Sequence, residues 1–122
     1  MDGNGIMSYK EFGKELEKRT FRFAIQIIHL SSNLPSSPEG RVIRQQITKS
    51  GTSVGANYRE ANRARSKADF HNKINICETE CSETQYWLEI IEVMKWIDSE
   101  QLKPIHKECS ELLAIFTSIG KK

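Results

Sequence analysis

Basic residues gather in the middle of the chain, where such side chains could neutralise the phosphates of a nucleic acid. Tyr58 lies among them and could stack on a base. In the other interpretation, these cations pair with acidic residues further along the chain, within one subunit or between copies. Exposed pairs of this kind would contribute only about 0–1 kcal/mol each. The residues alone leave both interpretations open. The candidate nucleic-acid ligands are Arg41, Arg44, Arg59, Arg63, Arg65 and Lys67.

The charge of the chain is unevenly distributed, although the net charge of its 122 residues is only +2. Residues 41–75 hold eight basic and two acidic residues, a net charge of +6. Residues 76–122 hold five basic and nine acidic residues, a net charge of −4. This asymmetry predicts that the basic segment faces an anionic partner, or the acidic segment of the same or another copy.

The cysteines and histidines could form a metal site, but their spacing does not favour one. Cys77 and Cys81 lie one helical turn apart, while the sequence has no C-x-x-C motif and no paired histidines. Buried cysteine packs as a small hydrophobic residue, and three cysteines are an odd number for a disulfide framework. We therefore expect Cys77, Cys81 and Cys109 to be reduced core residues of a cytoplasmic protein, with no metal and no cofactor.

The N-terminal segment resembles the second half of an EF-hand calcium loop, because Asp2-Gly3-Asn4-Gly5, Ser8 and Glu11 have the matching spacing. The first ligand position and the entering helix are missing, so we expect residues 1–7 to be a flexible leader and Ser8 to cap the first helix.

The chain has no nucleophile elbow, no phosphate-binding glycine loop and no clustered carboxylate pair with an evident partner. The sequence therefore predicts that the protein is not an enzyme.

Four amphipathic helices must position these residues, over residues 8–34, 38–64, 67–97 and 102–119. Pro35 stops the first helix, and Ser37 with Pro38 starts the second. Ser66 and Asp69 form a start resembling a capping box for the third, and Pro104 is expected in the first turn of the fourth. Short connections favour antiparallel neighbours. We predict an all-α fold, an antiparallel up-down-up-down four-helix bundle, formed by a single domain over residues 8–122.

Small and polar residues replace aliphatic ones on one face of the second helix. Ser50 and Asn57 continue the stripe that includes Ile47, and Gly51 and Gly55 suggest close approach of a neighbouring backbone. We expect this helix to pack closely on the third, with Asn57 buried and hydrogen-bonded to Glu60, Ser53 or a backbone carbonyl. The predicted buried or structural polar residues are Ser50, Ser53, Asn57, Glu60, Ser66 and Asp69.

The third helix carries a heptad seam from Phe70 to Ile91. Further apolar residues widen this face, so the helix is expected to touch more than one neighbour. We therefore predict a subunit interface that includes Trp87, Ile90 and Met94.

A long, gapless pattern carries a family resemblance. It is made by Gln46, Ser50, Ser53, Val54, Ala56, Asn57, Glu60, Ala61, Ala64, Ser66, Asp69 and Phe70, and the segment 76–89 continues it. From about Lys18 to Met94, the chain resembles the small "four helix bundle protein" family. The founders of that family are encoded by intervening sequences inside bacterial 23S ribosomal RNA genes, and the accessory variability protein of diversity-generating retroelements is a relative.

The resemblance implies a four-helix up-down bundle that assembles into a ring-like homopentamer, and it implies no catalytic residues. The retroelement relative is thought to bind nucleic acid and its reverse transcriptase through a basic surface. We therefore predict a non-enzymatic homo-oligomer that binds RNA or DNA through its second helix. The alternative is a scaffold or adaptor that binds a protein partner and uses the basic stretch for self-assembly.

No apolar run approaches the roughly 20 residues of a membrane span, so no membrane partner is expected.

Overall fold

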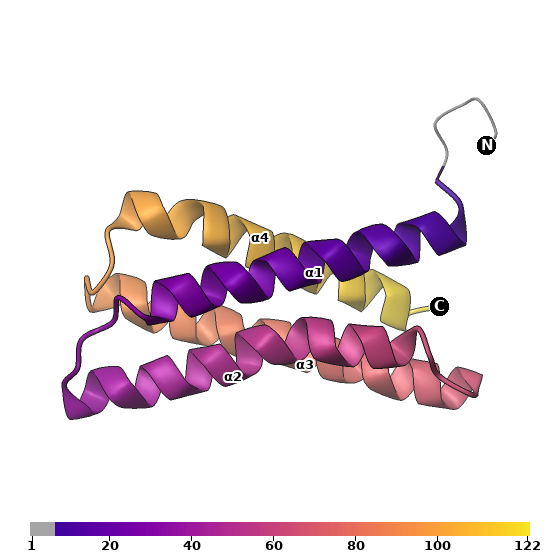
Figure 1. Ribbon diagram of the computed structural model, residues 1–122, viewed down its shortest axis with the longest axis horizontal. Coiled ribbons are helices and arrows are strands. Elements are labelled where there is room, and N and C mark those ends of the chain that lie inside the picture. Colours follow the sequence, from indigo (N-terminus) through magenta and orange to yellow (C-terminus); the bar gives the residue numbers. More distant parts are fainter. Residues whose placement is uncertain (1–6) are drawn as a thin grey trace.

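The computed structural model describes residues 7–122 and consists of four helices joined by short turns (Figure 1). They are α1 (Tyr9–Ser31), α2 (Pro38–Ala61), α3 (Lys67–Val93) and α4 (Ser99–Gly120). Successive helices run in opposite directions, so the predicted all-α, up-down-up-down bundle is confirmed. The resemblance of residues 2–5 to a calcium loop, and the predicted leader apart from Met7, lie outside the described residues.

Serine side chains start the first three helices, as their positions in the sequence predict. Ser8 Oγ accepts a hydrogen bond from the Glu11 backbone N–H at 3.1 Å, while Glu11 Oε1 accepts one from the Ser8 N–H at 3.3 Å. Ser37 accepts from the N–H of Gly40 at 3.1 Å, and Ser66 accepts from that of Asp69 at 3.0 Å. These bonds satisfy N–H groups that have no partner within a helix, so local sequence is enough to place the helix starts.

The other helix boundaries differ from the expected ones. α1 and α2 end three residues early, because the chain tightens into i→i−3 turns such as Leu34 N–H to Ser31 O, at 3.1 Å. α3 ends at Val93, where Lys95 takes a left-handed conformation with φ of 56°. α4 begins at Ser99, so Pro104 lies in its second turn and not in its first.

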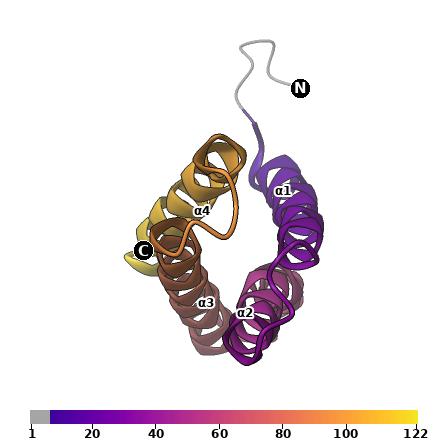
Figure 2. The ribbon, with the colours of Figure 1, turned by 90° about the vertical axis from the view of Figure 1, so that its left-hand side faces the viewer.

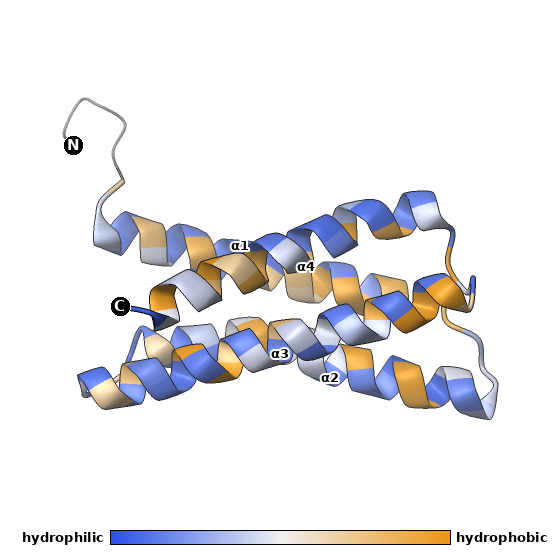
Figure 3. Cartoon of the chain, turned by 180° about the vertical axis from the view of Figure 1, so that it is seen from behind, coloured by the Kyte–Doolittle hydropathy of each residue, from blue (hydrophilic) through white to orange (hydrophobic). Residues whose placement is uncertain are grey.

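The helices follow one another around the bundle, and α1 and α4 touch most sparsely (Figure 2). Hydrophobic residues occur in patches along each helix, with hydrophilic residues between them (Figure 3). The largest fully buried side chains come from all four helices: Phe23, Ile27, Ile47, Ile74, Leu88, Ile91, Leu112 and Phe116.

An arginine bridges α1 and α4, the two neighbouring helices that touch most sparsely. Arg19 of α1 donates to Glu108 of α4 at 2.7 and 2.8 Å, and to Glu111 at 2.6 Å.

Close packing of α2 occurs on two sides, and its glycines at positions 51 and 55 face α1. A Cβ atom at Gly51 would lie 2.7 Å from Ile27 Cγ2, so the glycine allows close approach to α1. Towards α3, the hydroxyls of Ser50 and Thr84 are joined by a 2.8 Å hydrogen bond. The expected close approach to α3 is therefore only part of the packing, since the glycine at position 51 also allows α1 to approach α2 closely.

The predicted polar residues of α2 are less buried than expected. Ser50 is buried, but Ser53 and Asn57 are half-buried and bond to carbonyls of their own helix, Ser53 to Lys49 at 2.7 Å and Asn57 to Ser53 at 2.9 Å. Glu60 is exposed and forms a 2.8 Å ion pair with Lys73. These side chains lie beside the buried face, which runs through Ile47, Ser50, Val54 and Tyr58. Near α3, Ser66 is an exposed cap and Asp69 is half-buried.

Candidate nucleic-acid interface

The six predicted basic residues do not form one surface. Arg44 and Arg59 are 15 positions apart on α2, which places them about 22 Å apart along the helix axis. Arg44 donates from Nε to Ser31 O at 3.1 Å and from Nη2 to Leu34 O at 2.7 Å, so it holds the carbonyls where α1 ends. Arg41 donates to Ser36 O at 2.8 Å. These two arginines therefore brace the α1–α2 connection, and their role as phosphate ligands stays a prediction.

The other four candidates lie at the opposite end of α2, in the turn that follows it and at the first residue of α3. Arg59, Arg63, Arg65 and Lys67 are all exposed. The guanidinium carbon of Arg59 lies 5.6 Å from the centre of the Phe21 ring of α1, a cation–π distance. This contact joins the basic end of α2 to the outer face of α1.

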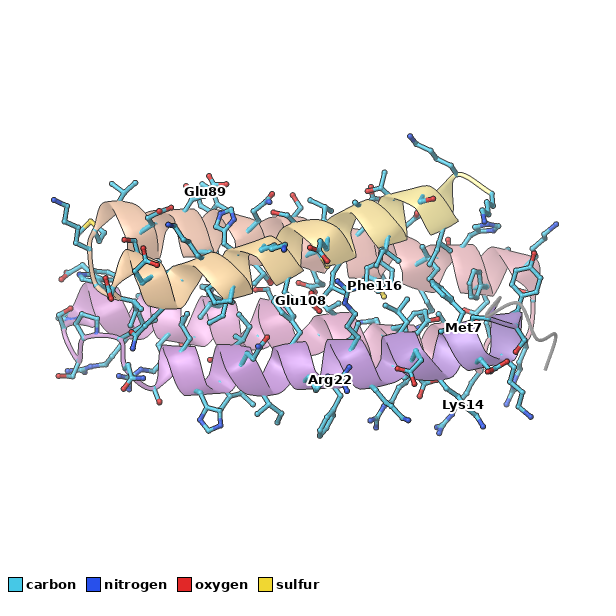
Figure 4. The ribbon with its side chains drawn as sticks, turned by 90° about the horizontal axis from the view of Figure 1, so that it is seen from above. Met7, Lys14, Arg22, Glu89, Glu108 and Phe116 are labelled. Carbon is cyan, nitrogen blue, oxygen red and sulfur yellow. The ribbon has the colours of Figure 1, made fainter. Side chains whose placement is uncertain are left out.

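The outer face of α1 adds basic residues that the sequence analysis missed. Lys14, Lys18 and Arg22 are exposed and, with Arg59, line a shallow hollow of about 310 Å³. Figure 4 shows Lys14 and Arg22 on the side of α1 that faces away from α4. Their spacing of four residues was the available signal, but it was hidden because residues 1–40 carry equal numbers of acidic and basic groups. We call this the basic surface, formed by Lys14, Lys18, Arg22 and Arg59.

Two carboxylates lie among these cations without neutralising them fully. Glu15 Oε1 is 3.7 Å from Lys18 Nζ, and Glu17 Oε1 is 3.9 Å from Arg59 Nε. Long ion pairs between exposed groups contribute about 0–1 kcal/mol, so an incoming phosphate can compete for these cations. Glu17 also accepts a hydrogen bond from the Asn62 amide at 2.8 Å, which engages its other oxygen.

Opposite charges lie on opposite halves of the bundle. α1 and α2 together carry nine basic and five acidic side chains, whereas α3 and α4 carry four basic and nine acidic ones. Glu89 of α3, on the far edge of the bundle from Arg22 in Figure 4, belongs to the acidic half. A polyanion would therefore be attracted to α1 and α2 and repelled by α3 and α4.

A groove of about 790 Å³ opens next to the basic surface, at the end of the bundle that holds the start of α1 and the end of α4. We call it the terminal groove. Burial raises the pKa of the Tyr58 hydroxyl in it, so that hydroxyl is protonated at neutral pH. All four helices contribute to the lining, which is mainly apolar and aromatic: Met7, Tyr9, Phe12, Gly13, Tyr58, Asn62, Lys67, Phe70, His71, Ala114, Ile115, Ser118, Ile119 and Lys122.

The three cysteines are buried and carry free thiols. Burial raises the pKa of Cys77 and of Cys109 to about 12, so both thiols are protonated at neutral pH. Cys77 donates to Val54 O at 3.5 Å, and Cys109 donates to Cys81 O at 3.3 Å. Across residues 7–122, no three or more His, Cys, Asp or Glu side chains come together in a group that could hold a metal ion.

None of the helices formed by residues 7–122 combines the length and the apolar character needed to cross a membrane.

The predicted interface residues lie at the C-terminal end of α3 and just beyond it. Trp87 and Ile90 are half-buried on α3, and Met94, just beyond it, is 52% exposed.

Comparison with known proteins places this bundle among relatives of similar size. A crystal structure of a protein of unknown function from the S23 ribosomal protein family of Bacteroides thetaiotaomicron is 38% identical, with a TM-score of 0.82. The match covers 90% of this chain and 98% of that one. No match was found among curated proteins. The family model for 23S rRNA-intervening sequence proteins matches residues 13–118. Since that range is most of the chain, the protein belongs to the 23S rRNA-intervening sequence protein family.

Proposed function

We propose that this protein binds structured nucleic acid, without catalysis, through the basic surface on α1 and α2. The observation that carries the proposal is the convergence of cations from two helices around the exposed ring of Phe21. The family description links its members to ribosomal RNA, which makes RNA the first ligand to test.

The dimensions of the basic surface suit a phosphate backbone. Lys14 and Arg22 are eight positions apart on α1, or about 12 Å along the helix axis. One strand of B-DNA advances about 3.4 Å per phosphate, so α1 alone spans roughly three to four phosphates. Arg59 of α2 lies beside α1 at the Phe21 ring, from which a second part of the backbone can be reached.

The test is a binding titration of the purified protein with an RNA hairpin and with duplex DNA, over a series of salt concentrations. Each phosphate contact adds about 0.9 to the slope of log K against log salt for a duplex. Changing Lys14→Ala and Arg22→Ala together should therefore weaken binding and reduce that slope by about 2.

The matched control removes two exposed cations from the acidic half. Lys103 and Lys107 of α4 have side chains that are 72% and 79% exposed. Changing both to alanine should leave the affinity and the salt slope close to those of the wild type. Absence of binding at low salt, or equal losses in the two double variants, would contradict the proposal.

A second candidate function, that of a self-assembling scaffold or adaptor, is favoured by the apolar end of α3. Val93 and Met94 are 78% and 52% exposed there, and Figure 3 shows several hydrophobic residues near this end. The indole N–H of Trp87 is buried and, among the described residues, has no hydrogen-bond partner. Exposed apolar residues of this kind are typical of a surface that another protein covers.

This candidate predicts that the protein is a homo-oligomer in solution. The solution mass should be a multiple of 14.0 kDa, and five times that mass if the homopentamer implied by the family resemblance forms. Met94→Glu should shift the mass towards the monomer, because it places a charge in the interface without disturbing the core. Ile76→Glu, at a position of similar kind that is 39% exposed on α3, is the control. A wild-type protein that is monomeric at high concentration would exclude the interface.

A further inference from the structure

The terminal groove presents aromatic rings at the same end of the bundle as most of the candidate cations. Figure 1 shows that the start of α1, the α2–α3 turn and the end of α4 all lie at this end. Phe12 comes from α1, Tyr58 from α2, and Phe70 and His71 from α3. Phe12 is 41% exposed, and Tyr58 is buried against Phe116 with ring centres 5.6 Å apart. The groove therefore has an accessible aromatic side and a firmly packed aromatic base.

The charges around the terminal groove favour an anionic occupant. Lys67 and Lys122 are among its lining residues, and none of those residues has a carboxylate side chain. Arg65 lies two positions before Lys67 and is exposed. A ligand that combines a flat apolar ring with a phosphate matches this combination of aromatic and basic side chains.

We propose that the terminal groove takes up an unpaired nucleotide of the nucleic acid that the basic surface holds, a proposal that rests on the function proposed above. A base within a duplex is stacked on its neighbours and cannot reach protein rings. An unpaired base at an end, in a bulge or in a loop can stack on aromatic side chains. The groove volume of about 790 Å³ lies within the range of sites that enclose small ligands.

The inference makes the protein selective for structured nucleic acid with an unpaired end. The basic surface supplies affinity for the duplex backbone, and the terminal groove adds contacts with the neighbouring unpaired nucleotide. The uncharged polar groups of the groove include the hydroxyls of Tyr9, Tyr58 and Ser118. They also include the Asn62 amide, which Glu17 orients through a 2.8 Å hydrogen bond. These groups can bond to the edge of a base.

The test compares a blunt RNA duplex with the same duplex extended by one unpaired 3′ adenosine, and repeats the pair in DNA. Stacking of one base on aromatic side chains strengthens binding about tenfold in comparable sites, so the extended duplex should bind about tenfold more tightly. A second readout replaces that adenosine with 2-aminopurine, whose fluorescence should change when the base leaves solvent and stacks in the groove.

Phe12→Leu and Phe70→Leu remove the rings but keep apolar side chains. Each should reduce the preference for the extended duplex to less than about threefold and weaken the 2-aminopurine response. Tyr86→Leu, which removes a 57% exposed ring from the acidic half, is the control and should retain the full preference. Far-ultraviolet circular dichroism checks that each variant is folded.

The outcomes separate this inference from the proposed function. If the wild type binds both duplexes equally, with a steep salt dependence, the basic surface functions as proposed and the inference about the groove is wrong. A preference for the extended duplex that survives in both phenylalanine variants also overturns the inference. If neither duplex binds at low salt, both proposals fail.

Discussion

Glycine-to-alanine substitution is expected to change stability in opposite directions at Gly13 and at Gly51. Both residues lie within helices, where alanine is favoured over glycine by about 0.8–1 kcal/mol. A Cβ atom at Gly13 would lie 3.5 Å from Asn62 Nδ2 and 3.7 Å from the Tyr58 hydroxyl oxygen, which is ordinary van der Waals contact. Gly13→Ala should therefore raise the free energy of unfolding by about 0.5–1 kcal/mol.

At Gly51 the added methyl group has no space. Its carbon would lie 2.7 Å from Cγ2, 2.8 Å from Cγ1 and 3.0 Å from Cβ of Ile27. Ile27 is fully buried, and a β-branched side chain in a helix has one strongly preferred rotamer. The clash must then be relieved by moving α1 away from α2, and overpacking of this kind costs about 1–3 kcal/mol. After the gain in helix propensity, we expect Gly51→Ala to lower the free energy of unfolding by about 1–2 kcal/mol.

The assay is urea unfolding followed by circular dichroism, at equal protein concentrations because assembly would couple stability to concentration. A double-mutant cycle isolates the clash. Ile27→Ala removes both γ carbons and should itself cost about 2–5 kcal/mol. Combined with Gly51→Ala, it should cost less than the sum of the two single changes, with a coupling of about 1 kcal/mol or more.

Three results would refute this reasoning. If the Gly51→Ala variant is as stable as the wild type, α1 and α2 are further apart than the structure shows. Additive effects of Gly51→Ala and Ile27→Ala would mean that the instability does not come from their contact. Reduced stability of Gly13→Ala would show that helix propensity is not the controlling factor at that position.

Three further predictions concern a helix end, the α1–α4 bridge and a buried thiol. Lys95 is left-handed at the end of α3, a conformation that glycine adopts without strain, so Lys95→Gly should raise the unfolding free energy by about 1 kcal/mol in urea unfolding. Arg19→Gln removes the charged hydrogen bonds to Glu108 and should lower the unfolding free energy by about 1–3 kcal/mol. The control is Lys103→Ala, which removes an exposed ion pair and should change the unfolding free energy by less than about 0.5 kcal/mol. Burial raises the pKa of Cys77 from 9.0 to about 12, so between these pH values the unfolded state loses this proton and the folded state keeps it. The free energy of unfolding should therefore fall as pH rises through this window, by up to about 1.4 kcal/mol per pH unit from this thiol. In unfolding titrations at several pH values, Cys77→Ala should make this decrease less steep. An unchanged pH dependence in that variant would show that this thiol is not a source of the loss.

The starts of the first three helices and the order of all four could be predicted from the sequence. The caps at Ser8, Ser37 and Ser66 act on N–H groups three positions away, and the seam of α3 repeats over short intervals. Such signals connect residues that are near one another in the chain, so they can be read without knowing which helices meet. The family pattern in α2 and α3 then favoured the bundle topology that the structure confirms.

Only the tertiary structure decided how the basic residues divide between structural and exposed roles. Arg44 is drawn to the carbonyls at the end of α1, and Arg59 lies over the Phe21 ring. The basic surface and the terminal groove each combine residues from helices that are distant in the chain. Charge and hydrophobic period show which face of a helix is polar or apolar, whereas the neighbour that each side chain reaches depends on the rotation and spacing of the packed helices.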